Sequence, residues 1–220
     1  LDCGTLACGK ACEPEIMPIK VLSTKVFVTT SVGDFDLVAK LYNPNTSYGA
    51  SRIEYSVDAF NYHGFTYISP GQTKHVILTS LKRPNSPAKK ESTTLVIKHA
   101  QWEKLDIPNN MVNFVLRRKD YHPTQKGSEL EAILYNDSNF DFDKIDVAVI
   151  LLDDIGDIVG VNKTDIRTFI SKTERGFSVV WPFALAGTVA RQDVEVSTNL
   201  FENSNFIKSY GTQEKFQKFY

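Results

Sequence analysis

The chain has 220 residues, and its 25 basic and 26 acidic side chains give a formal net charge of −1. This balance argues against bulk electrostatic attraction to nucleic acid or to an anionic membrane, so we expect no nucleic-acid partner. Hydrophobic residues make up 42% and charged residues 23% of the chain, which is typical of a folded domain and argues against disorder. No apolar run approaches the roughly 20 residues that a membrane-spanning helix needs.

The N-terminal segment contains all the cysteines, Cys3, Cys8 and Cys12, within the first dozen residues. Such a cluster predicts disulfide bonding in an oxidising compartment, with a remaining partner upstream of Leu1. Zinc and a free-thiol nucleophile are the alternatives. Zinc needs four ligands, whereas the nearest histidine is His63, and a nucleophile needs a nearby base.

The chain starts with Leu1 instead of Met, so we expect a processed product. Pro14 and Pro18 favour an extended lead-in and disfavour a helix. We therefore expect residues 1–20 to form an extended, cysteine-bearing stub outside the cytoplasmic membrane. Any membrane attachment is expected to come from an anchor upstream of Leu1.

The first half consists of short segments in which apolar and polar residues alternate, as in half-buried strands. Clusters of Gly, Pro, Asn and Asp separate these segments, as turns require. We expect strands at 25–32, 35–42 and 52–60, two strands within 64–81 around Ser69-Pro70-Gly71, and a closing strand at 93–105.

The second half repeats this order. "DLVAKLYN" (36–43) returns as "ELEAILYN" (129–136), so that Leu130 follows Leu37 by 93 positions. Ile170 follows Ile68 by 102 positions, which places additional residues in a longer hairpin around Gly156. We expect its strands at 113–121, 129–136, 144–152, within 167–183, and at 189–200.

The repeat predicts an all-β protein. About seven short strands per copy is the pattern of an immunoglobulin-like or fibronectin-III-like β-sandwich. We expect two tandem sandwiches, with Trp102 and Trp181 filling their interiors or ends. The predicted boundaries are 21–106 for the first sandwich, 107–111 for a semi-rigid linker, 112–205 for the second sandwich and 206–220 for a C-terminal tail.

The stub "LDCGTLACGKAC" resembles the end of the "DCGG-x-C-x-x-C" stub in predicted surface proteins of candidate-phyla bacteria. The pieces "YISPGQT", "VILLDDIGDIVG" and "FSVVWPFALAGTVARQDVEV" are similar to their two β-sandwich domains, in order. Each half also resembles the FxLYD and water-stress (late-embryogenesis type 2) modules. The chain departs from the stub pattern at Thr5, where a second Gly is usual. The resemblance implies a surface location and this fold, and no activity.

Two acidic clusters could supply oxygen ligands for calcium. Asp137, Asp141 and Asp143 lie in one predicted loop, and Asp153, Asp154 and Asp157 lie in another. No full calcium-loop pattern is present, so the sequence favours the other interpretation, that these residues cap turns, which is a common role of Asp. We therefore expect no cofactor, and a calcium site at Asp137, Asp141 and Asp143 is the alternative.

The predicted tail is rich in aromatic residues. Two interpretations are open: the rings dock on the second sandwich, or they contact a neighbouring subunit or a further domain. The candidate interaction residues are Phe206, Tyr210, Phe216, Phe219 and Tyr220.

No nucleophile–base pair, metalloprotease motif or phosphate-binding loop is present in the sequence, so we do not expect an enzyme. The sequence favours a non-catalytic, extracytoplasmic interaction or structural module, one that is a subunit of a cell-envelope assembly or appendage. Its partner would be another protein or a further copy of the chain. The alternative is a calcium- or glycan-binding β-sandwich module.

Overall fold

The computed structural model describes residues 15–29, 33–83, 93–105, 111–204 and 206. The elements of these residues are twelve strands and one short 3-10 helix, which confirms the predicted all-β fold. The cysteines, most of the predicted linker and most of the C-terminal tail lie outside the described residues.

The strands of the first half run in chain order as β1 (Lys20–Val28), β2 (Asp34–Tyr42), β3 (Tyr48–Val57), β4 (Tyr62–Ile68), β5 (Thr73–Lys82) and β6 (Val96–Lys104). Those of the second half are β7 (Phe114–Pro123), β8 (Ser128–Asn136), β9 (Phe142–Leu152), β10 (Ile158–Phe169), β11 (Glu174–Trp181) and β12 (Arg191–Ser197). Each half thus has six strands within the described residues, where about seven were expected. Residues 58–60, predicted to belong to the strand at 52–60, instead form the 3-10 helix η1 (Asp58–Phe60).

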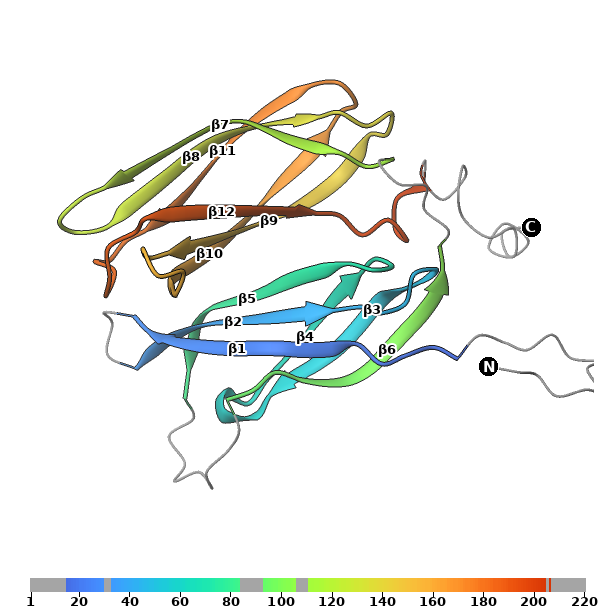
Figure 1. Cartoon of the computed structure of the whole chain (residues 1–220), viewed down its shortest axis with the longest axis horizontal. Coiled ribbons are helices and arrows are strands. Elements are labelled where there is room, and N and C mark those ends of the chain that lie inside the picture. Colours follow the sequence, from blue (N-terminus) through green and yellow to red (C-terminus); the bar gives the residue numbers. More distant parts are fainter. Residues whose placement is uncertain (1–14, 30–32, 84–92, 106–110, 205, 207–220) are drawn as a thin grey trace, which may run out of the picture.

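The strands form four antiparallel sheets of three strands each, in the orders β1-β2-β5, β4-β3-β6, β10-β9-β12 and β11-β8-β7. The first two sheets enclose one apolar core and the last two enclose another, so each half is a sandwich. Figure 1 shows the four sheets stacked as layers, with β1-β2-β5 facing β10-β9-β12 in the middle.

Strand β2 shows how the sequence pattern builds this stack. Leu37, Ala39 and Leu41 alternate along the strand and lie in the first core. Val38, on the opposite face, is also buried, in a separate apolar cluster with Ile150 and other residues of the second sandwich. The outer face of this sheet is therefore covered as well.

The two halves correspond closely, with one correction to the predicted alignment. Ile68 is fully buried, but its predicted counterpart Ile170 is 45% exposed. Phe169, one position earlier, is fully buried and takes the equivalent place. The extra length of the second copy lies where expected, because β9 and β10 have 11 and 12 residues against 10 and 7 in β3 and β4. Gly156, in the turn of this longer hairpin, has a φ of 87°.

The two tryptophans differ in depth. Trp181 is buried in the second core, where its indole N–H donates to the Val161 carbonyl at 3.0 Å. Trp102 packs against the first core and is only partly buried. Both therefore contribute to sandwich interiors.

Candidate functional site

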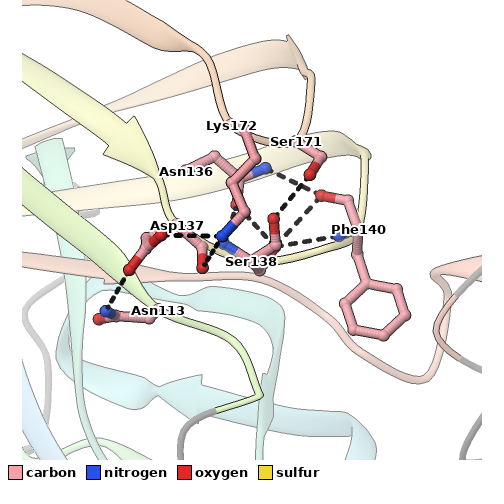
Figure 2. A network of polar contacts seen from close by, with 7 residues as sticks. All are labelled: Asn113, Asn136, Asp137, Ser138, Phe140, Ser171 and Lys172. Carbon is pink, nitrogen blue, oxygen red and sulfur yellow. Dashed lines mark hydrogen bonds and ion pairs between the residues drawn. The ribbon is translucent and has the colours of Figure 1, made fainter.

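The loop after β8 contains the first acidic cluster, and its centre is the buried Asn136 (Figure 2). The Asn136 side-chain amide donates to the carbonyls of Phe140 at 2.8 Å and Phe169 at 3.2 Å. Its Oδ1 accepts hydrogen bonds from the backbone N–H and the hydroxyl of Ser138. One side chain therefore ties this loop to the end of β10.

Asn43 makes the same arrangement in the first sandwich, 93 positions earlier. Its amide donates to the carbonyls of Tyr48 at 2.7 Å and Ser69 at 3.0 Å, and its Oδ1 accepts from the N–H of Asn45. The Asn that ends each "LY-N" strand is thus an internal bracket between two turns, which gives the repeat a structural explanation.

The carboxylates of this loop are engaged in structural contacts. Asp137 lies 2.9 Å from the Lys172 ammonium, which donates a hydrogen bond to it and lowers its pKa (Figure 2). Asp141 accepts a hydrogen bond from the N–H of Ser171 at 2.7 Å. Asp143 instead lines a cleft between the sandwiches. These contacts match the turn-capping interpretation.

The structure does not bring Asp137, Asp141 and Asp143 together. Among the described residues, no group of three or more His, Cys, Asp or Glu side chains is placed to hold a metal ion. In the second acidic cluster, Asp153 Oδ1 accepts from the N–H groups of Ile155 and Asp157, as a turn residue does. A calcium site at either loop stays a prediction from sequence.

Of the five tail aromatics, the structure describes only Phe206. This ring is fully buried in the second core and packs edge-on against Phe140 at 5.1 Å. Phe206 therefore docks on its own sandwich. Cys3, Cys8, Cys12, Tyr210, Phe216, Phe219 and Tyr220 lie outside the described residues.

The junction between the sandwiches is held first by apolar contacts. Val38 and Ile77 of the first sandwich are buried with Ile150, Leu152 and Val161 of the second. Leu105, which follows β6, belongs to the second core. Phe201 of the second sandwich approaches Gly49 of β3 so closely that a Cβ there would lie 2.5 Å from the ring.

Polar contacts cross the same junction. The Tyr67 hydroxyl donates to Asp146 at 2.7 Å and shares a hydrogen bond with Ser197 at 3.2 Å. The His75 backbone N–H donates to Glu195 at 2.9 Å, and His75 Nδ1 lies 2.7 Å from the other oxygen of that carboxylate. These bonds fix the register of one sandwich against the other.

Beside these bonds lies a polar cleft of about 530 Å³, lined by both sandwiches. Strands β3, β4 and β5 supply one wall, and strands β9, β10 and β12 with the segment after β12 supply the other. The volume lies within the range of small-molecule sites. This cleft is the candidate functional site.

Lys74 is the most unusual residue of the cleft. It shares the core-facing side of β5 with Val76 and Leu78, and only 5% of its surface is exposed. Its Nζ lies 3.2 Å from the centre of the Tyr67 ring, a cation–π contact. Burial lowers the Lys74 pKa to about 7, against the opposing effect of Asp146 and Glu195.

The other charged groups of the cleft are arranged around Asp146. Burial opposes ionisation of this carboxyl, but the hydrogen bonds from Lys144 and Tyr67 outweigh it and lower its pKa. Burial also raises the pKa of the Tyr67 hydroxyl, which therefore stays a donor. Lys163 has a lowered pKa, because the cleft removes water from its ammonium.

Comparison of the chain with protein-family models, curated proteins and solved structures found no match. The described residues contain no helix long and apolar enough to cross a membrane.

The cleft was not predicted from sequence. Lys74 carried a signal, because it is a charged residue on the apolar side of an alternating strand. Tyr67, Asp146 and Glu195 carried none, since their meeting depends on how the two halves pack. His75 contacts Glu195, a residue 120 positions away, through the same packing.

Proposed function

We propose that this chain is a non-catalytic module of the cell surface, which holds two β-sandwiches as one rigid unit. It acts through contacts with protein partners or with further copies of itself, as part of a cell-envelope assembly. The resemblance of its cysteine stub and repeated halves to bacterial surface proteins supports the location.

The observation that carries this proposal is that both apolar packing and hydrogen bonds hold the junction. A purely flexible tandem would need only a linker, whereas here an apolar cluster and directional hydrogen bonds act together. Apolar burial supplies association free energy, and hydrogen bonds to charged groups specify one orientation. A fixed orientation suits a structural subunit, because forces and contacts are transmitted through it without a hinge.

The sheets also offer surfaces for partners. Each has only three strands, so two of the three are edge strands whose outer backbone groups lack a ladder partner within the described part of the chain. Such edges can accept an added strand from another chain. This is the mode of association that we expect for the assembly.

Two measurements test the proposal. Surface biotinylation of intact cells should label the chain, and crosslinking on those cells should capture it with an envelope protein or another copy. Sedimentation velocity of the purified chain over a concentration series should show self-association if the partner is a second copy. A chain that is labelled only after lysis, or that is monomeric and forms no crosslink on cells, would contradict the proposal.

A further inference from the structure

Two lysines of the cleft have no hydrogen-bond or ion-pair partner in the part of the chain that the structure describes. The Lys74 ammonium makes its cation–π contact with Tyr67, but it has no hydrogen bond or ion pair within the described part of the chain. The Lys163 ammonium, which lines the same cleft, likewise has none among those residues. A buried cation without a counterion is costly, so this arrangement points to a ligand that supplies one.

The nearby carboxylates are already committed to other groups. Asp146 receives the Lys144 ammonium and the Tyr67 hydroxyl, each at 2.7 Å. Glu195 receives the His75 N–H and ring on its two oxygens. Neither acid lies within ion-pair distance of Lys74. These two carboxylates thus serve the junction, and neither pairs with Lys74 or Lys163.

The remaining lining contains the charged residues Arg52, Asp143 and Glu202 together with polar and aromatic side chains. Hydroxyl groups of Ser51, Thr66 and Thr164 and the rings of Tyr55 and Phe65 border the same space. Hydroxyls suit a ligand that both donates and accepts hydrogen bonds, and ring faces suit its C–H surfaces. The volume of about 530 Å³ accommodates a molecule of mono- to disaccharide size.

We propose that this cleft binds a hydroxylated small molecule of that size through its carboxylate or phosphate group, which Lys74 and Lys163 hold. Lys74 supplies the buried, preorganised charge, and Lys163 contacts the anion from the more exposed side.

The protonation of Lys74 makes this binding dependent on pH. The charged groups that face Lys74 are Asp146 and Lys144 on β9, Lys163 on β10 and Glu195 on β12. Tyr67 faces it from β4, and His75 is its neighbour on β5. With a pKa of about 7 in the free protein, Lys74 is charged below neutrality and loses its proton above it. The anion binds the charged form, so affinity falls as pH rises through this value.

Isothermal titration of the whole chain tests the proposal with three probes. D-Glucuronate carries a carboxylate, D-glucose 6-phosphate carries a phosphate, and D-glucose carries neither. We expect at least one anionic sugar to bind, and glucose to bind at least about tenfold more weakly. The tighter of the two anions identifies which acid group the cleft takes.

Lys74→Met and Lys163→Met should each weaken that binding by about tenfold or more, whereas Lys126→Met, at an exposed turn, should not change it. Circular dichroism checks that each variant is folded, and the exposed Lys163 provides a test if Lys74→Met is not. For glucuronate, whose carboxylate stays ionised over the whole range, affinity should fall by about tenfold or more between about pH 6 and about pH 9. Absence of binding by both anions, equal binding of glucose, or unchanged affinity in the folded lysine variants would overturn the proposal.

Discussion

Tyr67 in the first sandwich donates its hydroxyl hydrogen to Asp146 in the second, across 2.7 Å. The same hydroxyl lies 3.2 Å from Ser197 on the neighbouring strand. One phenol thus joins two strands of the opposite sandwich, and its ring covers the Lys74 ammonium. Tyr67 therefore links the rigidity of the junction to the chemistry of the cleft.

Tyr67→Phe should lower the free energy of unfolding by about 1–3 kcal/mol, because the partly buried Asp146 carboxylate loses one of its two donors. The pKa of Asp146 should rise, since the hydrogen bond from Tyr67 lowers it. Urea unfolding at neutral pH measures the first effect. Tyr135→Phe is the matched control, because its hydroxyl has no hydrogen-bond partner among the described residues. Equal stabilities of the two variants would contradict this account.

Asn43→Ala and Asn136→Ala should each destabilise the protein by about 2–4 kcal/mol. Each substitution leaves two partly or fully buried carbonyls without their side-chain donor and one turn without its acceptor. The two losses should be similar, because the brackets are equivalent. Asn113→Ala, at an exposed position, should change stability by less than about 0.5 kcal/mol. A near-neutral effect at Asn43 or Asn136, measured by thermal or urea unfolding, would show that the bracket is dispensable.

Gly49→Ala should weaken the junction, because its Cβ would lie 2.5 Å from the Phe201 ring and 2.9 Å from the Ile68 carbonyl oxygen. Overpacking of this kind costs about 1–3 kcal/mol. Adding Phe201→Leu should recover part of the loss by making space, giving a favourable coupling in a double-mutant cycle. Gly176→Ala, whose Cβ would have its nearest neighbour at 3.9 Å, is the control. Strictly additive effects at Gly49 and Phe201 would argue against their contact.

The stability of the protein should rise with pH above neutrality. The Lys74 pKa is about 7 in the folded protein, against 10.5 as its ordinary value. Between these values the unfolded chain binds more protons, so raising the pH favours folding by up to several kcal/mol. Below about pH 7 Lys74 is protonated in both the folded and the unfolded chain, so the folded protein bears the full free-energy cost of burying the charge.

Lys74→Met should remove this slope and increase stability at about pH 6, where the wild type buries an ammonium. Urea unfolding at intervals from about pH 6 to about pH 9 measures both effects. The range ends at about pH 9 because tyrosine in the unfolded chain ionises near pH 10, whereas Tyr67 in the folded protein has a raised pKa. Above that pH, Tyr67 would make stability fall as pH rises, which opposes the effect of Lys74. Lys126→Met should keep the wild-type slope. If the unfolding free energy of Lys74→Met changed with pH as much as that of the wild type, a group other than Lys74 would be responsible for the pH dependence.

Calcium should not change the melting temperature, because the Asp137 and Asp141 carboxylates are already bonded within the protein. Differential scanning fluorimetry with millimolar Ca²⁺ and with chelator measures this. Asp141→Asn combined with Asp143→Asn is the matched variant. A rise in melting temperature with Ca²⁺ in the wild type, absent from the variant, would support the metal-binding alternative instead.

Much of the fold could be predicted from the sequence, because strand formation and face assignment follow from local alternation. Within the predicted strand at 35–42, Leu37, Ala39 and Leu41 occupy alternate positions, and all three are core residues. The alignment of Ile68 with Ile170 was wrong by one position, because it matched two isoleucines, whereas the buried counterpart of Ile68 is Phe169. In a strand, a shift of one residue exchanges the buried and exposed faces.

The cleft could not be predicted in the same way. Lys74 and Asp146 lie 72 positions apart, in different sandwiches. The one unusual local feature is that Lys74 occupies the core-facing side of its strand. Their proximity results from packing the outer face of β1-β2-β5 on β10-β9-β12. That packing is signalled only weakly, by apolar residues such as Val38 on a face that alternation alone would leave to solvent.

The sequence by itself determined the strands and the two similar halves, because backbone pleat and turn chemistry act over a few neighbouring residues. Only the tertiary structure decided which outer faces meet, which charges lose their water and where a cleft remains. Those features depend on desolvation and distance between segments far apart in the chain, and no local pattern encodes such quantities.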